Sequence, residues 1–444
     1  MNILLLQPKF INSEVSFPLG LAYLASSLKA SRHKVFALDC AFCDFDRIED
    51  LIKLEKIELI AISSHSYNYK NALHLSRKIK SLFSIPIVFG GPHCTIFPEA
   101  TIKEPTVDFV IVGGGESIIT KLAESLEQNN SLEDIPSLHY KDKKGNVLRN
   151  DVPSPTDTLT DLAFPDRTVF PLKSYYGVNS RYQPYAPIIT SRGCIHDCKY
   201  CPSRKLWKNW RARSTKNIVD EIEEIKKSGI NEFHIEDDNF LADHERVGDI
   251  CSEIIKRKLK IHWQCTNGIY PEDLDPKLLE KMSKSGCYRI ALGIESLNKT
   301  LLATLNRNLD LGKIKKIINT ANQHSIEVVG YFFLGLPGEN LGSITHTIHQ
   351  SKKLKLSFSI FSIFHVIPGS ELFESRKDQF DYAKMIQNEI SFCEVPIQTL
   401  KKLKNYAYFS NLQNPRFYTY LLRSLLSPKN IRNILLKFKQ HGLC

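Results

Sequence analysis

The chain has 444 residues, a net charge of +11 and ordinary apolar, aromatic and charged fractions, which favours a globular protein of two or three domains. Its first residues lack the pattern of a secretion signal and no run of about 18 apolar residues occurs, so we expect a cytoplasmic protein without membrane spans. Its eleven cysteines are odd in number and scattered, which argues against a framework of disulfides.

The first 130 residues alternate strand-like apolar runs with segments of helical periodicity. The helical segments include Leu19–Ala30 and Tyr69–Phe83. Each apolar run ends in polar or turn residues, as parallel strands do. These runs are NILLLQP, KVFALDC, LIAISSH, IPIVFGGP and VDFVIVGGGE. We therefore predict an α/β domain over residues 1–130, with a doubly wound, Rossmann-like parallel sheet.

Polar and glycine residues follow these strands, at the edge where doubly wound sheets bind ligands. Glycines let the backbone approach a large flat or phosphate-bearing ligand, and Glu116 begins a helix with free N–H groups. Glycine-rich turns also serve simply to reverse the chain, and a lone histidine is often only a hydrogen-bonded loop residue, so both interpretations stay open at this point. The candidate binding residues are Gln7, Asp39, Ser63, His65, Gly90, Gly91, Pro92, His93, Gly113, Gly115 and Glu116.

Residues 131–185 break the alternation. They are rich in Pro, Asp, Ser and Thr without a sustained period, which predicts an interdomain linker. A second alternating series then predicts a partial (β/α)6 barrel of the TIM type over residues 186–380, followed by a helical extension over 381–444. The strand-like runs of this series are APIIT, EFHIED, IHWQCTN, YRIALGIES, EVVGYFFLGLP and FSIFSIFHVIPG.

Three cysteines with the spacing CxxxCxxC follow the first of these barrel strands: Cys194, Cys198 and Cys201. A tetrahedral zinc site requires a fourth ligand, and no CxxC or HxxxH partner lies near. Three thiolates on one loop instead suit a 4Fe–4S cluster whose fourth iron is open to a substrate or cofactor. Chance is the remaining explanation, and it requires three cysteines to gather where barrels place their chemistry.

The segment RGCIHDCKYCPSR resembles the cluster loop of the radical S-adenosylmethionine (SAM) enzymes. The resemblance implies that Cys194, Cys198 and Cys201 bind the cluster and that the backbone at Tyr200 contacts the adenine of SAM. It extends across the barrel through FHIEDDNF, QCTNG, ALGIES and GLPGEN. Acidic residues at such positions can also cap helices. The residues implied for the amino group, ribose or methionine portion of SAM are Glu236, Asp237, Asn267 and Glu295.

The front domain resembles the cobalamin-binding domain that precedes this barrel in one branch of the family, with PLGLAYLASSL, GGPHCTIFPE and VDFVIVGGGES at its loops. The resemblance makes the eleven loop residues given above candidates for cobalamin contacts. Two departures stand out. Gly114 occupies a position where the family commonly has an acidic residue. Asp39 is followed by Cys40 and Ala41 instead of the Asp-x-His-x-x-Gly element, so no histidine of that element lies under the cobalt.

The resemblance also implies a reaction. The reduced cluster would cleave SAM to methionine and a 5'-deoxyadenosyl radical, with an external electron donor such as flavodoxin or ferredoxin, and cobalamin would deliver a methyl group to an unactivated carbon of a small-molecule substrate. Three alternatives stay open. They are a cobalamin-dependent cyclase or rearrangement enzyme, which FSNLQNPRFYTYLLRSLL in the tail faintly resembles; a tRNA methylthiotransferase with an auxiliary cluster on Cys40, Cys43 and Cys94; and a non-enzymatic cobalamin-binding protein.

No RNA-binding barrel follows the radical domain, so nucleic acid is not expected as a partner. The basic charge belongs to the tail, which has nine Lys or Arg and no Asp or Glu from Lys401 onward. Pro428 divides this apolar and basic segment into two predicted helical pieces. Packing onto the barrel with a solvated basic face is the simpler interpretation, and peripheral attachment to a membrane is the alternative.

Overall fold

The structure is a computed structural model, and two units make up the chain, Met1–Tyr175 (unit 1) and Tyr176–Cys444 (unit 2). In the described residues no helix is both long and apolar enough to cross a membrane. The residues that the structure describes are 1–10, 15–142, 144–150, 158–175, 177, 180–381, 384–385, 387 and 389–418.

Unit 1 contains a seven-stranded sheet with the strand order β2-β1-β3-β4-β5-β6-β7. The first five strands of this order are parallel, which confirms the predicted doubly wound sheet. The last two pair antiparallel and arise from the stretch in which the sequence predicted a linker, because strands of three or four residues are too short to show an alternating pattern. The strands are β1 Asn2–Gln7, β2 Lys34–Asp39, β3 Leu59–Ser63, β4 Ile87–Gly90, β5 Phe109–Ile111, β6 Leu138–Lys141 and β7 Val147–Arg149.

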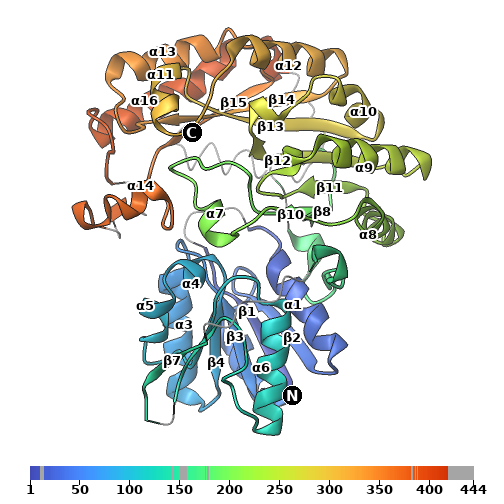
Figure 1. Ribbon diagram of the computed structural model, residues 1–444, viewed down its shortest axis with the longest axis vertical. Helices are drawn as coiled ribbons and strands as arrows, with labels where there is room; N and C mark the ends of the chain where they lie inside the picture. Colours follow the sequence, from blue (N-terminus) through green and yellow to red (C-terminus); the bar gives the residue numbers. More distant parts are fainter. Residues whose placement is uncertain are drawn as a thin grey trace. The chain divides into compact units, whose positions relative to one another are not determined.

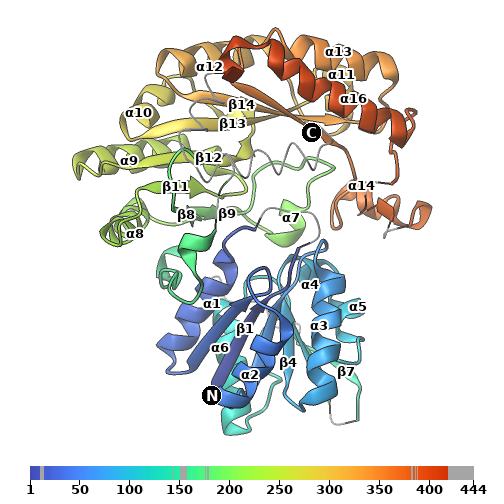
Figure 2. The same cartoon turned by 180° about the vertical axis from the view of Figure 1, so that it is seen from behind.

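Helices cover both faces of this sheet (Figures 1 and 2). The continuous apolar run in β1 explains why: Ile3, Leu4, Leu5 and Leu6 are all fully buried, so alternate residues face opposite helical layers. Leu4 and Leu6 share one core with apolar residues of α2 and α3. The helices are α1 Leu19–Ala30, α2 Phe45–Glu55, α3 Tyr69–Leu82, α4 Pro92–Ile96, α5 Pro98–Ile102 and α6 Glu116–Gln128.

Unit 2 contains a six-stranded parallel sheet in which neighbours follow chain order, β8-β11-β12-β13-β14-β15. The two outer strands do not pair with each other, so the sheet forms the partial barrel that the sequence predicted. The strands are β8 Tyr185–Ile188, β11 Glu232–Ile235, β12 His262–Ile269, β13 Cys287–Glu295, β14 Glu327–Leu334 and β15 Phe358–Ile363.

The connecting helices of unit 2 lie outside the curved sheet (Figure 1). They are α8 Thr215–Lys227, α9 His244–Lys256, α10 Leu278–Lys284, α11 Lys299–Thr304, α12 Leu311–Gln323 and α13 Leu341–Ser351. A short hairpin of β9 (Ser191–Arg192) and β10 (Arg211–Ala212), with the helical turn α7 (Ser203–Leu206) between them, follows β8. The chain therefore carries a long excursion at the carboxyl end of its first barrel strand.

The segment after the barrel packs onto its last strand. Helix α16 (Ile397–Ser410) contacts β15, and the side chain of Asn411 donates to and accepts from the backbone of Ser359, at 3.0 Å in each case. These bonds satisfy the backbone N–H and C=O of one residue, Ser359, at the edge strand β15. The packing interpretation therefore holds for residues 397–418, while the rest of the predicted tail, residues 419–444, lies outside the described residues.

A buried polar network occupies the amino ends of the barrel strands. Glu232 accepts from the hydroxyl of Tyr288 and lies 3.2 Å from the ring of His234, while Arg289 and Glu327 pair at 2.6 Å. Burial raises the pKa of Glu232 to about 8 and lowers that of His234 to about 3. Since barrel chemistry sits at the carboxyl ends of the strands, this network bears on stability.

Candidate functional site

The loop after β8 presents three thiols at the carboxyl edge of the sheet. Gly193 begins the loop with φ of +88°, and a Cβ there would lie 2.7 Å from the carbonyl oxygen of Asn209, so only glycine fits. The N–H of Cys201 donates to the carbonyl of Cys198 at 2.9 Å, which folds the intervening residues into a turn. Both residues and Cys194 are free cysteines.

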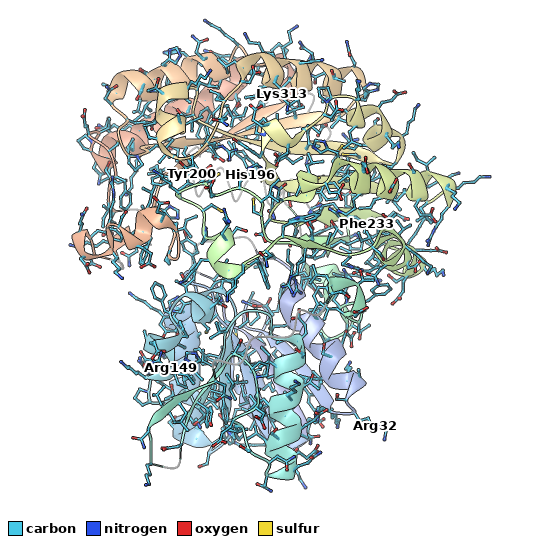
Figure 3. The ribbon with its side chains drawn as sticks, in the orientation of Figure 1. Arg32, Arg149, His196, Tyr200, Phe233 and Lys313 are labelled. Atoms are coloured by element: carbon cyan, nitrogen blue, oxygen red, sulfur yellow. The ribbon has the colours of Figure 1, made fainter. Side chains whose placement is uncertain are left out.

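Hydrogen-bond donors point at two of these sulfur atoms. The backbone N–H of His196 lies 3.4 Å from the Sγ of Cys194, and the side-chain amide of Asn239 lies 3.6 Å from it. Arg307 donates its Nη1 to the Sγ of Cys198 at 3.7 Å. Figure 3 shows His196 on this loop. Such donors favour sulfur atoms that carry negative charge, as metal-bound thiolates do.

Three thiols on one loop are the donor set that an iron–sulfur cluster uses. In the part of the chain that the structure describes, no three His, Cys, Asp or Glu side chains lie close enough to hold one metal ion. A cluster has another requirement, since each thiolate binds its own iron. Burial raises the pKa of Cys194, and it raises that of Cys201 to about 12 although its side chain reaches solvent, so binding iron must displace these protons.

Asp237 anchors the root of the loop. Its buried carboxylate accepts hydrogen bonds from the backbone N–H of Thr190 and the hydroxyl of Ser191, both at 2.6 Å, and also from the Thr190 hydroxyl. Arg246 lies 3.9 Å from the same carboxylate. Burial raises the pKa of Asp237, and these partners lower it. The carboxylate that the sequence assigned to SAM is thus engaged with the chain itself.

Residues that directly follow β11, and Asn267 of β12, surround this anchor. Asp238 accepts from the N–H of Gly193 at 2.9 Å, which fixes the start of the loop. The side chain of Asn267 donates to the carbonyl of Asp237 at 3.1 Å, so these two predicted residues lie together. Glu236 is half-buried at the end of β11. Asn267 is exposed.

Glu295 and Arg307 form a buried ion pair at the carboxyl end of β13. Their side chains approach to 3.7 Å and are 11% and 7% exposed. Arg307 also donates to the carbonyl of Gly293, and its guanidinium lies 4.3 Å from the ring centre of Tyr270. Glu295 has φ of +65°, an unusual conformation for this residue type. Burial raises the pKa of Glu295, and Arg307 offsets that effect. The pair therefore places a fixed charge pattern beside the cysteine loop.

Aromatic side chains build an apolar wall next to this pair. Tyr200, which Figure 3 shows on the cysteine loop, is 6% exposed and meets the rings of Phe333 and Phe364 at 5.8 and 6.3 Å. The charges of Glu295 and Arg307 both act on its hydroxyl, and burial raises the pKa of Tyr200 well above its ordinary value. These rings meet Tyr200 edge to face, at interplanar angles of 78° and 88°, and such apolar surroundings exclude water.

The turn after β14 has an internal role. Glu339, fully buried, accepts the backbone N–H groups of Gly335 and Leu336 at 2.8 and 3.0 Å and the hydroxyl of Ser296 at 3.4 Å. Burial raises the pKa of Glu339 to about 7. This carboxylate ties the ends of β13 and β14 together, so the GLPGEN segment shapes the edge of the barrel.

In unit 1, the carboxyl ends of β3 and β4 form a tight junction. Gly91 has φ of +97°, and a Cβ there would lie 2.9 Å from the carbonyl oxygen of Ser64. Ser63 and Gly90 are neighbours in the sheet, and the N–H of His93 donates to Ser64 at 3.0 Å. Pro92 occupies the first turn of α4. The structure therefore brings the predicted residues of these two loops together.

The histidines at this junction are part of a ring cluster. His93 is 4% exposed, stacks on Tyr69 with centroids 3.8 Å apart, and lies 3.1 Å from the hydroxyl of Ser66. Burial lowers the pKa of His93 to about 4, so its ring is neutral at pH 7. His65 packs against Phe10 at 5.6 Å. Neutral rings suit a large uncharged or flat ligand.

Asp39 and Gln7 end the first two strands of the unit 1 sheet. Asp39 accepts from the N–H of Ala41 at 2.8 Å and the hydroxyl of Tyr175 at 3.0 Å, and burial raises its pKa. The N–H of Cys40 donates to the carbonyl of Gln7 at 2.9 Å, which joins the two loops. The side chain of Gln7 bonds locally to the next residue.

The glycine run after β5 leaves bare backbone at the edge. Gly113 has φ of +82°, nothing lies within 4 Å of a Cβ built there, and its N–H donates to the hydroxyl of Thr95 at 3.0 Å. Gly115 is packed differently, because its Cβ would lie 3.3 Å from Leu24. Glu116 starts α6 and is 8% exposed. The open space at Gly113 is what a backbone contact with a large cofactor needs.

Three residues of the site were missed by sequence reasoning. Asp238 and Asn239 lie in FHIEDDNF, where polar residues follow a barrel strand, so a signal for them existed. Arg307 lies in the loop after α11, and nothing in its neighbourhood of the sequence marks it. Its burial beside Glu295 and Cys198 depends on the tertiary structure alone.

Comparisons with family models match both units. The model described as the radical SAM superfamily matches residues 188–350, and the model of the B12 binding domain matches residues 14–123. Together these stretches include the cysteine loop and nearly all the loops at the carboxyl edge of unit 1.

Similar proteins of known sequence or structure span most of the chain. An uncharacterized methyltransferase of Pyrococcus horikoshii, PH0819, is 28% identical over 84% of this chain and 83% of its own length. The anaerobic magnesium-protoporphyrin IX monomethyl ester cyclase of Rubrivivax gelatinosus is 24% identical over 86% of this chain and 72% of its own.

A solved structure has the same architecture. The radical SAM methyltransferase TsrM of Kitasatospora setae, with tryptophan and a SAM analogue bound, has a TM-score of 0.72 at 17% identity and covers 85% of this chain and 76% of its own. At this identity the likeness concerns the fold.

Proposed function

We propose that this chain, a radical SAM enzyme with a B12-binding domain, methylates an unactivated carbon atom of a small-molecule substrate. Both expected resemblances are thereby confirmed, and with them the cofactors SAM, a 4Fe–4S cluster and cobalamin. The observation that carries the proposal is the loop after β8, with its three free thiols and the N–H donors directed at the sulfur atoms of Cys194 and Cys198.

Each part of the site in unit 2 has a task in this proposal. Cys194, Cys198 and Cys201 hold the cluster, which together with SAM supplies one-electron chemistry, while cobalamin supplies methyl transfer. Asp237 keeps the loop in place through its hydrogen bonds to Thr190 and Ser191. Glu295 offers a buried carboxylate for the polar groups of SAM.

The aromatic wall serves a reaction that must stay dry. A radical or a strongly reducing centre is lost to water or to a misplaced substrate, so the site must exclude solvent and hold the reacting atoms close. The burial of Tyr200, together with Phe333 and Phe364 around it, provides such surroundings. The backbone at Tyr200 is assigned to the adenine and Asn267 to the ribose.

In unit 1, the loop residues at the carboxyl edge are assigned to cobalamin. Gly113 offers bare backbone with open space, and the neutral ring of His93 lies at the same edge. Asp39 is engaged with Tyr175 and lies in a loop without the histidine element, so its assigned task is to hold that loop. The lower face of the cobalt is left to another ligand.

The test is an anaerobic turnover assay on the full chain with a reconstituted cluster, cobalamin, SAM and a strong reductant. Methylation predicts that S-adenosylhomocysteine appears together with 5'-deoxyadenosine. The variant Cys198→Ala should produce neither in a reductant-dependent way, whereas Cys251→Ala, a buried cysteine on α9, should behave like the parent. Deoxyadenosine from Cys198→Ala would overturn the assignment of the cluster ligands.

A cyclase or rearrangement enzyme is the second candidate. The similarity to the magnesium-protoporphyrin cyclase over 86% of the chain favours it. It predicts deoxyadenosine without S-adenosylhomocysteine in the same assay. For either reaction, we propose that an external donor such as flavodoxin or ferredoxin supplies the electron.

The proposed membrane contact of the basic tail is tested separately. Liposome binding is compared between the full chain and a chain without residues 419–444.

A further inference from the structure

We propose that Cys40 and Cys43 form a redox-active dithiol that closes reversibly to an intramolecular disulfide. The pair lies in the loop between β2 and α2 of unit 1, whereas the cysteines of the barrel loop belong to unit 2. Both are free thiols in this structure. The order strand, Cys-x-x-Cys, helix is the setting in which thiol–disulfide exchange sites occur in α/β proteins.

The backbone already folds the two thiols toward each other. The N–H of Phe42 donates to the carbonyl of Asp39 at 2.9 Å, which closes a turn over residues 39–42. The thiol of Cys43 donates to the same carbonyl at 3.4 Å, so the Cys-x-x-Cys segment forms one compact loop. Forming the S–S bond therefore requires only a short approach of the sulfur atoms.

The surroundings give the two thiols different roles. Interaction with Cys40 lowers the pKa of Cys43; burial and the carboxylates of Asp39 and Asp44 act in the opposite direction, and the positive charge of Arg47 lowers the pKa. Cys43 also lies one residue before the N-cap of α2, Asp44, where the positive end of the helix favours an anion. The pKa of Cys40 is raised by its hydrogen bond to Cys43 and by burial. Cys43 is thus the attacking thiol, and Cys40 is the resolving thiol.

The reaction balances with a low-molecular-weight or protein disulfide as the oxidant. The Cys43 thiolate attacks one sulfur of that disulfide, forms a mixed disulfide and releases the first thiolate. Cys40 then loses its proton to solvent and attacks the Cys43 sulfur, which releases the second thiolate. The chain loses two protons and two electrons, and the external disulfide is reduced to two thiols.

Cys40 and Cys43 differ in solvent exposure from Cys94, the third cysteine of unit 1. Cys40 and Cys43 are half-buried, so an external disulfide can reach them. Cys94 is fully buried, and burial raises its pKa to about 12, which makes it an unreactive control within the same unit.

The test is redox equilibration of the full chain without SAM, so it is independent of methyl transfer. The protein is incubated anaerobically in mixtures of reduced and oxidised glutathione, alkylated, digested with trypsin and analysed by mass spectrometry. The peptide of residues 35–47 contains both cysteines and is distinct from the peptides of the cluster cysteines. We expect a form two hydrogens lighter to accumulate as the oxidised fraction rises, and to disappear with dithiothreitol.

Two further measurements test the roles of the two thiols: glutathione trapping in single variants and alkylation rates in the parent protein. Cys40→Ser should hold a glutathione mixed disulfide on Cys43, and Cys43→Ser should hold none on Cys40. In the parent protein, Cys43 should be alkylated at least about tenfold faster than Cys94. A peptide that stays doubly alkylated in every mixture, or glutathione added separately to both cysteines, would overturn the proposal.

Discussion

Replacing Arg307 by methionine should destabilise unit 2 strongly. Methionine keeps the length of the side chain and removes its charge. Arg307 is 7% exposed, pairs with Glu295 at 3.7 Å and donates to the sulfur of Cys198 at 3.7 Å. Its loss leaves the Glu295 carboxylate buried without a counter-charge.

The structure sets the size of the effect. Removing one partner of a buried ion pair costs about 3–5 kcal/mol, because the remaining charge cannot be solvated. Adding Glu295→Gln removes that charge, so the double variant should lose only about 1–3 kcal/mol, the cost of unmade hydrogen bonds. Glu295→Gln thus partly rescues Arg307→Met, and the coupling between the two positions is favourable.

The effect should also depend on pH. Burial raises the pKa of Glu295 in the folded chain, and without Arg307 it rises further. A carboxyl whose folded pKa exceeds its unfolded pKa destabilises the fold as pH rises between the two values. Arg307→Met should therefore be less destabilised at pH 5 than at pH 8, while the double variant shows little difference.

Urea unfolding of the full chain provides the measurement. All three tryptophans, Trp207, Trp210 and Trp263, belong to unit 2, so their fluorescence follows this unit alone. Arg289→Met, which breaks the pair with Glu327 at the opposite end of the strands, is a control that should not be rescued by Glu295→Gln. Equal losses for Arg307→Met with and without Glu295→Gln, at both pH values, would refute the reasoning.

Three further outcomes follow from the described contacts. Gly91→Ala should cost unit 1 about 1–3 kcal/mol in thermal unfolding, more than Gly145→Ala, because both have positive φ but only the first brings a Cβ against Ser64. Glu232→Gln should flatten the pH dependence of the unfolding free energy. Because the pKa of Glu232 is raised to about 8, the parent loses stability as pH rises from about 4.3 toward 8. An unchanged pH profile in the variant would contradict this. Asp237→Ala should lower iron content after reconstitution more than activity per iron, since the carboxylate anchors the loop; an unchanged iron content would exclude that role.

Much of the fold was accessible from local pattern. The strands of both parallel sheets were predicted because buried parallel strands are continuous apolar runs that end in turn residues, as β1 does. The strands β6 and β7 were missed, since three or four residues hold too little pattern and their pairing with β5 is decided by distant contacts. A linker composition does not exclude a short strand at a sheet edge.

The candidate site shows the same difference between features that are local in sequence and features that depend on distant contacts. The spacing of the cysteines after a predicted barrel strand indicates a cluster loop, because three thiols on one short segment are close in the sequence. By itself the sequence therefore determined the two domain types and the parallel character of both sheets, and it predicts Cys194, Cys198 and Cys201 as the cluster ligands. The sequence alone could not predict roles that depend on contacts between residues far apart in the chain. The tertiary structure alone decided that Asp237 faces Thr190 and Ser191, that Arg307 meets Glu295 and Cys198, and that Asn239 reaches Cys194, because burial and pairing follow from packing and not from neighbours in sequence.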